Sequence, residues 1–362
     1  MQHFTRKGYG GNHGLYILPS IVIMNNYVRV GVIGCGKIAQ IRHIPEYAKN
    51  TDVKIVGFFD HVQERAEGMA AKYGGIAFPS IDALLTCDDI DAVSVCTANS
   101  THKDITVAAL RCGKHVLCEK PMAATVSECE EMAEVAQKEG KNLMIAHNQR
   151  FFGIHKRAKE LLDSKEIGRP LTFRTTFGHS GPDNWSVDAG TSNWFFDKNK
   201  SAFGVVADLG VHKIDLMRYL FGCDVVALDA MLDVLDKKDA SGNPVSVEDN
   251  AIMLCRMENG AMGTVTVSWT YYKEEDNDTA IYGSEGIMKL SVADRTITVI
   301  KKDGTQKKEI LPPDKSSGVI DAFIHSIRAN ETPAVSAEDV IPSMRTVIAA
   351  IESARTEKRV KI

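Results

Sequence analysis

Residues 30–39 read VGVIGCGKIA, and this stretch decides the fold. It places the pattern G-x-G-x-x-A directly after an apolar strand and at the start of a helix. Gly34 permits a tight turn, Gly36 has no side chain to block a pyrophosphate, and Ala39 lets the helix pack close to the strand. The helix N-terminus also offers unpaired N–H groups to phosphates. We therefore predict a dinucleotide site that includes Gly34, Gly36, Lys37, Ile38 and Ala39.

An acidic residue follows where a ribose contact is expected. Asp60 ends the second predicted strand, 21 residues after Ala39. A carboxylate there accepts hydrogen bonds from ribose hydroxyls and repels a 2′-phosphate. The next residue is His61 and not arginine, so the pattern favours NAD over NADP as the cofactor. The alternative is that the glycines only shape a strand–helix turn and that Asp60 is a surface charge.

The first half of the chain alternates short β-rich runs with helical stretches. Such an order specifies a parallel sheet with helices on both faces, and the right-handed crossover rule makes it doubly wound. We therefore predict an α/β fold with an N-terminal Rossmann domain over residues 27–148. Its strands are expected at 28–33, 53–59, 92–96, 115–118 and 143–146, and its helices at 38–50, 62–73, 102–111 and 126–139.

The pattern changes after residue 150, where strand-like runs follow one another. Turn signals such as Glu258-Asn259-Gly260 and Asp303-Gly304 separate several of them. Consecutive strands with tight turns indicate antiparallel pairing. We predict an α+β domain over residues 149–362 with a mostly antiparallel open sheet. Its strands are expected at 171–177, 225–235, 251–257, 261–269, 287–292 and 296–301, and its helices at 206–221, 317–329 and 336–355.

Composition excludes several classes of function. The net charge of −4 provides no basic field for a nucleic acid or an anionic membrane. The eight cysteines form no C-x-x-C pair, and no histidine lies at finger spacing from them, so we expect neither a disulfide framework nor a metal site. Reduced thiols in a soluble protein indicate the cytoplasm.

The first 26 residues form a separate N-terminal extension. Arg6 and Lys7 precede an apolar run at 15–24 that is shorter than the ~20 residues needed to span a bilayer. No A-x-A cleavage site follows the run. We interpret residues 1–26 as an extension translated from upstream of a start at Met24, a hypothesis that the intact mass of the natural protein would test.

Three later motifs occur in a recognisable order. Residues 97–102 read TANSTH, residues 113–121 read GKHVLCEKP, and residues 208–215 read DLGVHKID. From Val28 onward the chain resembles the glucose–fructose oxidoreductase / inositol dehydrogenase (Gfo/Idh/MocA) family, in which T-P-N-x-x-H, G-K-H-V-x-x-E-K-P and D-x-G-x-H-x-x-D follow in this order. Two departures are Ala98 in place of the usual proline and a glycine-poor segment at 203–205.

The resemblance implies a nicotinamide cofactor on the first domain and a substrate cleft against the second sheet. It implies hydride transfer to or from a hydroxyl or carbonyl of a sugar, a sugar derivative or inositol. It also implies a homodimer or homotetramer formed through the open face of that sheet. By resemblance, the additional cofactor contacts are Thr97, Asn99, His102, Glu119 and Lys120.

Three residues in these motifs suit the oxidation of an alcohol. His212 suits a base, because its ordinary pKa of about 6.5 lies near working pH. Asp208 lies four residues earlier on the predicted helix, so it either orients the imidazole or accepts a substrate hydroxyl itself. Lys120 follows a strand at the ligand-binding edge of the sheet and can stabilise an alkoxide. Each has a structural alternative: His212 as a satisfied core histidine, Asp208 as a surface cap or ion-pair partner, and Lys120 as a solvated lysine.

Polar and aromatic residues near these motifs suit a polyol, whose hydroxyls need partners and whose ring faces stack on indole. Arg150 could meet a carboxylate, whereas Asp215 is expected to be structural. The predicted substrate residues are Asn148, Arg150, Trp185, Asn193 and Trp194.

Two other functions compete with a dehydrogenase. One is a glycosidase that uses its nicotinamide transiently, and the other is a non-catalytic regulator that senses a cofactor or sugar. The regulator predicts loss of the reacting residues, yet Lys120, Asp208 and His212 are all present. Fold alone does not separate these functions.

Overall fold

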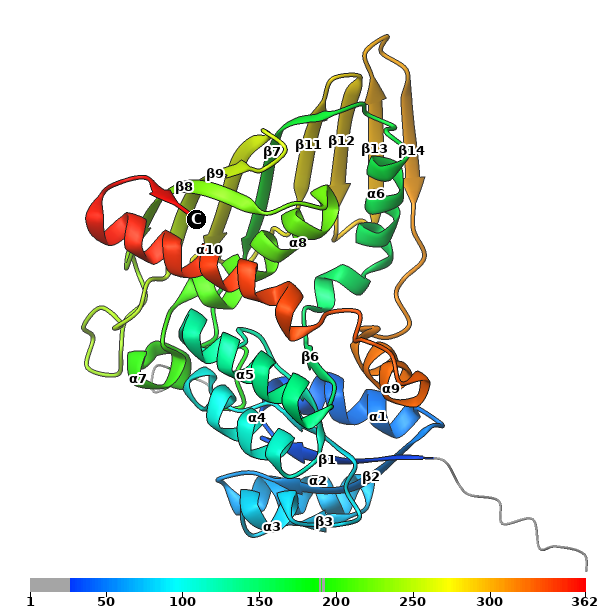
Figure 1. The fold of residues 1–362 in the computed structure, drawn as a ribbon. Coiled ribbons are helices and arrows are strands. Elements are labelled where there is room, and N and C mark those ends of the chain that lie inside the picture. The colour runs from blue at the N-terminus through cyan, green and yellow to red at the C-terminus, as the bar shows by residue number, and fades with distance from the viewer. Residues whose placement is uncertain (1–26, 189, 191–192) are drawn as a thin grey trace, which may run out of the picture.

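The computed structural model describes residues 27–188, 190 and 193–362, so the predicted extension lies outside the described residues. The first of its two sheets has six parallel strands in the order β3-β2-β1-β4-β5-β6 (Figure 1). The strand order reverses between β1 and β4, which confirms the doubly wound fold. The strands are β1 Val28–Ile33, β2 Val53–Phe59, β3 Ile76–Ala77, β4 Ala92–Val95, β5 His115–Cys118 and β6 Leu143–Ile145.

Helices follow the strands of this sheet as the alternating pattern predicted. The first begins as a π-helical turn, η1 Ala39–His43, and continues as α1 Ile44–Lys49. The predictions missed β3 and α3, because a two-residue strand and a five-residue helix are too short to show a period. The other helices are α2 Gln63–Tyr73, α3 Ile81–Leu85, α4 His102–Arg111 and α5 Val126–Glu139, with a 3-10 turn, η2 Asn99–Thr101, before α4.

The second sheet has nine strands in the order β14-β13-β12-β11-β7-β10-β9-β8-β15. Its two central strands, β7 and β10, pair in parallel, and the other described pairs are antiparallel, which confirms a mostly antiparallel sheet. The predictions missed β11, β14 and β15. The strands are β7 Pro170–Gly178, β8 Val225–Asp233, β9 Asn250–Met257, β10 Met262–Ser268, β11 Thr279–Gly283, β12 Gly286–Ser291, β13 Thr296–Lys301, β14 Gln306–Ile310 and β15 Val360–Lys361.

Helices α6, α8 and α10 cover one face of the second sheet (Figure 1). The sequence analysis missed α6, although Ile154, Ala158 and Leu162 are buried at helical spacing and carried the signal. The helices of this half are α6 Gly153–Asp163, α7 Lys198–Ser201, α8 Val211–Phe221, α9 Val319–Ala329 and α10 Ala337–Thr356. Short turns are η3 Asn148–Phe151, η4 Trp194–Phe196 and η5 Val206–Gly210.

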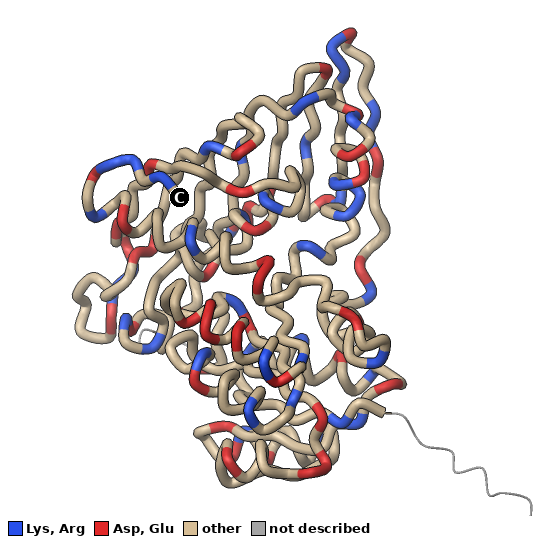
Figure 2. Tube along the Cα trace, in the orientation of Figure 1, with Lys and Arg blue, Asp and Glu red and all other residues tan. Residues whose placement is uncertain are grey.

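The C-terminal segment returns to the first sheet and joins the two halves. Ser317 Oγ, just before α9, donates to Glu46 Oε2 at 2.7 Å, and Ile145 N at the end of β6 donates to Val335 O at 3.0 Å. Acidic and basic residues are interspersed along both halves of the trace (Figure 2). In the described part of the chain, no helix is both long and apolar enough to cross a bilayer.

Six histidines lie wholly or largely inside the structure with lowered pKa values. Burial is the main cause in each case, because it disfavours the charged imidazolium. The pKa falls to about 4 for His115 and to about 3 for His155, and it is also lowered for His102, His147, His179 and His212.

We expect the free energy of unfolding to decrease as the pH falls from about 6.5 toward 4. In this range the unfolded chain binds protons at imidazoles that stay neutral in the folded chain. Each such histidine therefore changes the free energy of unfolding by up to ~1.4 kcal/mol per pH unit. Urea unfolding over a pH series measures this slope. His155→Gln removes one such imidazole and should flatten the slope; an unchanged slope would contradict the low pKa of His155.

Candidate active site

The turn after β1 leaves the space that a dinucleotide needs. Gly34 has φ +91°, and a Cβ there would lie 2.5 Å from the carbonyl oxygen of Cys96. A Cβ at Gly36 would meet no protein atom within 4 Å. Gly36, Lys37 and Ile38 remain partly exposed, whereas Ala39 is buried. The turn therefore has the form of a phosphate cradle, and its residues fit the predicted cofactor.

The Asp60 carboxylate is anchored to this turn. It accepts hydrogen bonds from Cys35 N at 2.7 Å and from Val62 N at 2.9 Å. Although the next residue is His61 and not arginine, the Arg65 guanidinium on α2 lies 3.8 Å from the Asp60 carboxylate. That guanidinium is also paired with Asp188, so its charge is shared between two carboxylates.

Two residues predicted to contact the cofactor, His102 and Asn99, hold the loops of the site. His102 is fully buried, with Nδ1 2.8 Å from the carbonyl oxygen of Pro121 and Nε2 3.2 Å from that of Thr97. A neutral imidazole donates to one of these carbonyls, so His102 links the two loops, and its predicted contact with the cofactor stays a prediction. Asn99 Nδ2 donates to Ser201 O at 2.9 Å, which ties this loop to α7.

Glu119 belongs to a buried chain of hydrogen bonds beneath the carboxyl ends of the strands. Its Oε1 lies 2.9 Å from His43 Nε2, and Ser94 Oγ lies 3.1 Å from His43 Nδ1 and 2.7 Å from Tyr47 Oη. Burial opposes ionisation of Glu119, yet the His43 hydrogen bond and nearby cations lower its pKa to about 2. Glu119 is therefore a carboxylate at neutral pH.

Lys120 and Asp208 meet at the centre of the candidate site. The Lys120 ammonium donates to Asp208 Oδ1 at 2.8 Å and to the Asp208 carbonyl at 3.0 Å. Trp269 Nε1 donates to Asp208 Oδ2 at 3.0 Å. Burial opposes ionisation of Asp208, but Lys120, His179 and the hydrogen bonds hold its pKa below the usual value. Asp208 is therefore an ionised carboxylate with both oxygens engaged.

Asp208 does not orient the His212 imidazole through a hydrogen bond, which was one of the two roles left open for it, because none joins these side chains in the described structure. Asp208 lies in η5, the π-helical turn before α8. Asp208 instead faces Lys120 and Trp269.

His212 lies beside this pair and is only 8% exposed. Its ring centroid is 6.1 Å from that of His147 and 5.9 Å from that of Phe177. Burial holds the pKa of His212 well below its ordinary value, and the Lys120 charge lowers it further. The imidazole is therefore neutral at physiological pH and free to accept a proton.

Three predicted substrate residues lie around Phe195, whose ring meets that of Trp269. Asn193 accepts from Phe195 N at 3.0 Å and donates to Pro182 O at 2.9 Å, so its amide holds the loop. Trp194 stacks on Phe195 with centroids 3.9 Å apart. Trp185 is 38% exposed and meets the edge of Phe195.

The other two predicted substrate residues lie deeper. Arg150 donates through Nε and Nη2 to the Asp215 carboxylate, at 2.7 and 2.6 Å, and pairs with Asp339 through Nη1. Its guanidinium is thus engaged by carboxylates of the chain itself, and Asp215 has the structural role expected of it. Asn148 is buried beside it at the start of η3.

The sequence analysis did not identify Trp269, His179 or His147 as site residues. Trp269 ends the strand predicted at 261–269, and a buried indole N–H needs a partner, which was the available signal. The two histidines carried no motif, because their neighbours come from distant segments.

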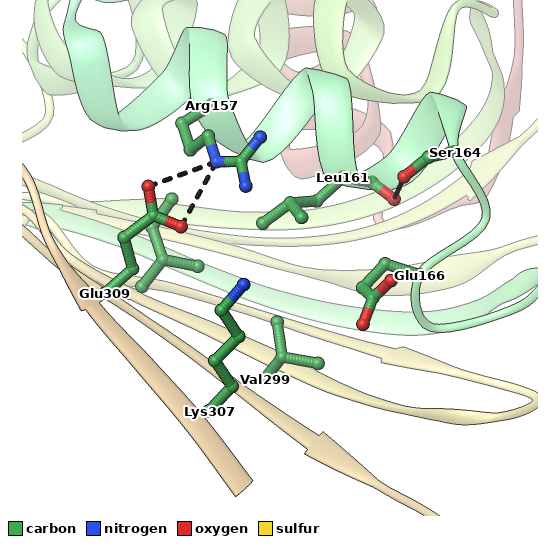
Figure 3. A pocket seen from close by; sticks show the side chains of 8 residues that line it. Arg157, Leu161, Ser164, Glu166, Val299, Lys307 and Glu309 are labelled. Atoms are coloured by element: carbon green, nitrogen blue, oxygen red, sulfur yellow. Dashed lines mark hydrogen bonds and ion pairs between the residues drawn. The ribbon is translucent and has the colours of Figure 1, made fainter.

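A separate cavity of about 240 Å³ lies between α6 and the strands β13 and β14 (Figure 3). Arg157 Nε donates to both carboxylate oxygens of Glu309 at 3.2 Å. None of the predicted site residues lines this cavity, so it is not part of the candidate active site. Its lining residues are Arg157, Leu161, Ser164, Glu166, Ile297, Val299, Lys307 and Glu309.

Comparisons with known proteins agree with the resemblance. A family model described as oxidoreductase family, NAD-binding Rossmann fold, matches residues 28–147, and one described as GFO/IDH/MocA C-terminal domain matches residues 155–289. Myo-inositol 2-dehydrogenase of Thermotoga maritima is 27% identical over 344 residues, which cover 92% of this chain and 98% of the relative.

Two solved structures share the fold. Aldose-aldose oxidoreductase from Caulobacter crescentus, complexed with glycerol, has a TM-score of 0.82 at 24% identity and covers 93% of this chain and 100% of its own. Levoglucosan dehydrogenase, in complex with NADH and levoglucosan, has a TM-score of 0.83 at 23% identity. The match covers 93% of this chain and 99% of the levoglucosan dehydrogenase chain.

Alanine at the two glycines of the turn should separate stability from cofactor binding. Gly34→Ala places a methyl group against the Cys96 carbonyl at positive φ, so we expect it to lower the melting temperature. Gly36→Ala meets no protein atom, so we expect the wild-type melting temperature but NAD affinity at least ~10-fold weaker. Thermal unfolding and calorimetric NAD titration measure both. Unchanged affinity in Gly36→Ala would contradict the phosphate cradle.

Proposed function

Because the chain belongs to the GFO/IDH/MocA family of NAD-binding oxidoreductases, we propose that it transfers a hydride between NAD and a hydroxyl-bearing carbon of a sugar, a sugar derivative or inositol. The relatives support this substrate class, since their names include myo-inositol and levoglucosan, which are polyhydroxylated rings. The observation that carries the proposal is the Lys120–Asp208 ion pair beside a neutral, buried His212.

Lys120 is suited to hold the reacting oxygen. An ammonium has three N–H donors, and two of those of Lys120 go to Asp208. The third can donate to the substrate hydroxyl and then to the alkoxide that develops as the hydride leaves. A positive charge that is already positioned stabilises this oxygen without reorganisation. Asp208 thereby positions Lys120.

His212 is suited to take the hydroxyl proton. Its Nδ1 is enclosed by protein, so the small exposed part of the ring lies elsewhere, and we assign Nε2 to the substrate. The proton moves from the hydroxyl to this nitrogen as the carbon loses its hydride. In the reverse direction the imidazolium returns the proton to the carbonyl oxygen.

The cofactor fits the carboxyl ends of the first sheet. When bound, NAD supplies the carbon that accepts or gives the hydride. Gly34, Gly36 and Ala39 would hold the pyrophosphate, and Asp60 would accept from the adenosine ribose. Thr97, Asn99 and Glu119 would line the nicotinamide half. Trp185 and Trp194 would offer ring faces to the substrate.

Removing either reacting residue should abolish turnover while NAD still binds. We expect Lys120→Ala and His212→Ala to lower kcat by about 100-fold or more, since proton transfer and charge stabilisation each contribute that much. NADH formation with a panel of inositols, aldoses, sugar acids and amino-sugars measures turnover, and fluorescence titration measures NAD binding.

Lys103→Ala is the matched control, because this lysine also pairs with carboxylates but lies on α4 away from the site. Thermal unfolding identifies any variant that fails to fold. Near-wild-type turnover in Lys120→Ala or His212→Ala would contradict the assignment. Conversion of a glycoside without net NADH would favour the glycosidase alternative.

The open face of the second sheet supports a homodimer or homotetramer. Four apolar side chains on β8, β9 and β10 are exposed there: Met231, Ile252, Leu254 and Met262, at 45–78%. Ile252 pairs with Met231 across the two strands. Exposed apolar side chains gathered on one face of a sheet, here with Asp229 and Arg256 among them, are typical of an association surface. The free state of all eight cysteines supports a cytoplasmic location.

A charge on this face should dissociate the oligomer. We expect Leu254→Glu to convert a dimer or tetramer into a monomer in light scattering, because a carboxylate would be buried without a partner. Ile76→Glu is the control, since Ile76 is 55% exposed at the edge of the first sheet. An oligomer that survives Leu254→Glu would place the interface elsewhere.

A further inference from the structure

The helix that carries Asp208 is capped by a residue from a distant part of the chain. Its first turn, η5, begins at Val206 and continues directly into α8, and the Val205 side chain before it has no atom that can accept a hydrogen bond. The first N–H groups of a helix have no partner within the helix, so other groups satisfy them. Here the acceptor is Glu248, which lies shortly before β9.

Glu248 binds the start of this helix through both its side chain and its main chain. Its Oε1 accepts from Gly204 N at 2.9 Å and from Val206 N at 3.2 Å. Its main-chain carbonyl accepts from Val205 N at 2.9 Å. A Cβ at Gly204 would lie 2.0 Å from that carbonyl oxygen, so the two segments are in direct contact. The segment 203–205, which departs from the family pattern, therefore keeps a glycine where it touches Glu248.

The hydrogen bonds continue from this contact to Asp208 and Lys120. Asp208 N donates to Gly204 O at 3.1 Å, so Gly204 is bonded to Glu248 through its N–H and to Asp208 through its carbonyl. The Asp208 carbonyl in turn accepts from the Lys120 ammonium at 3.0 Å. A movement of the segment against Glu248 would therefore displace the main chain to which Lys120 is bonded.

The residue after Glu248 holds the other partner of the Asp208 carboxylate. Asp249 is fully buried, and its carboxylate accepts from the main-chain N–H groups of residues 235–237 at 2.7–2.9 Å. Its carbonyl accepts from Trp269 N at 2.8 Å, and Trp269 Nε1 donates to Asp208 Oδ2 at 3.0 Å. Residues 248 and 249 thus hold Asp208 through its main chain and through its carboxylate.

We propose that Glu248 is a positioning residue, which fixes the turn that carries Asp208 and, through Asp208, the place of the Lys120 ammonium. The inference rests on the proposed function, in which Lys120 holds the reacting oxygen. A reacting group misplaced by ~1 Å can cost up to ~100-fold in rate, because the developing charge is no longer met at the right point. Loss of Glu248 should therefore lower kcat more than it weakens binding.

Three substitutions of Glu248 separate reach from charge. Glu248→Ala removes the acceptor, Glu248→Asp keeps the charge but is one methylene shorter, and Glu248→Gln keeps an oxygen that reaches both N–H groups. We expect kcat about 10- to 30-fold lower for Ala, about 3- to 10-fold lower for Asp and within ~3-fold of wild type for Gln. The substrate KM and the NAD affinity should change by less than ~3-fold in each variant.

Ser80→Ala is the matched control, because it also removes a helix cap. Ser80 Oγ accepts from Ala83 N at 3.1 Å at the start of α3, and none of the predicted site residues lies on α3. We expect a lower melting temperature but wild-type kcat and KM. Wild-type kcat in Glu248→Ala and Glu248→Asp, or a kcat in Glu248→Gln as low as in Glu248→Ala, would overturn the proposal.

A readout without substrate separates this inference from the proposed function. Trp269 is one of three tryptophans, so its ¹⁹F resonance in protein labelled with 5-fluorotryptophan can be identified with Trp269→Phe. We expect this resonance to shift in Glu248→Ala, because Asp208 moves relative to the indole, and to stay in place in Glu248→Gln and Ser80→Ala. An unmoved resonance in Glu248→Ala would overturn the positioning role. Failure of the proposed function looks different: the wild type would form no NADH with any polyol in the panel, and the ¹⁹F spectrum would still show whether Glu248 fixes Asp208.

Discussion

The ion pair between Lys120 and Asp208 joins the two sheets at the point where the candidate site residues meet. Lys120 comes from the end of β5, and Asp208 comes from the π-helical turn before α8. Both side chains are largely buried, so each loses hydration that the pair alone does not restore. The Trp269 indole and the Asp208 carbonyl supply the remaining hydrogen bonds. This link between the two halves therefore also places a positive charge at the centre of the candidate site.

The same pair sets the protonation state of the groups around it. Burial lowers the pKa of His212 most, and the Lys120 charge lowers it further, so His212 stays neutral. Behind His212 lies a negative charge, because Asp215 is an ionised carboxylate held by Arg150. The site thus lies between a fixed positive charge and a fixed negative charge. Groups whose environments separate their pKa values in this way are typical of acid–base centres.

Hydrogen bonds from buried histidines hold the loops that carry the candidate site. His102 lies between main-chain carbonyls of the two loops that follow β4 and β5. His43 links the Glu119 carboxylate to the Ser94 hydroxyl. Rigid support of this kind limits how far reacting groups can drift from productive geometry. Among the residues predicted to touch the cofactor, His102 and Asn99 therefore also hold the loops of the site.

The sequence by itself determined the doubly wound sheet, the glycine turn, the acidic residue after β2 and the identity of Lys120, Asp208 and His212. These depend on strand and helix periods, on turn chemistry and on motifs within a few residues. Only the tertiary structure decided which side chains meet. Asp208 bonds Lys120 and Trp269 and not His212, and the packing of the two halves brings His147 beside His212. The physical reason is that such contacts join segments far apart in the chain, so they depend on helix phase and strand order that no local pattern contains.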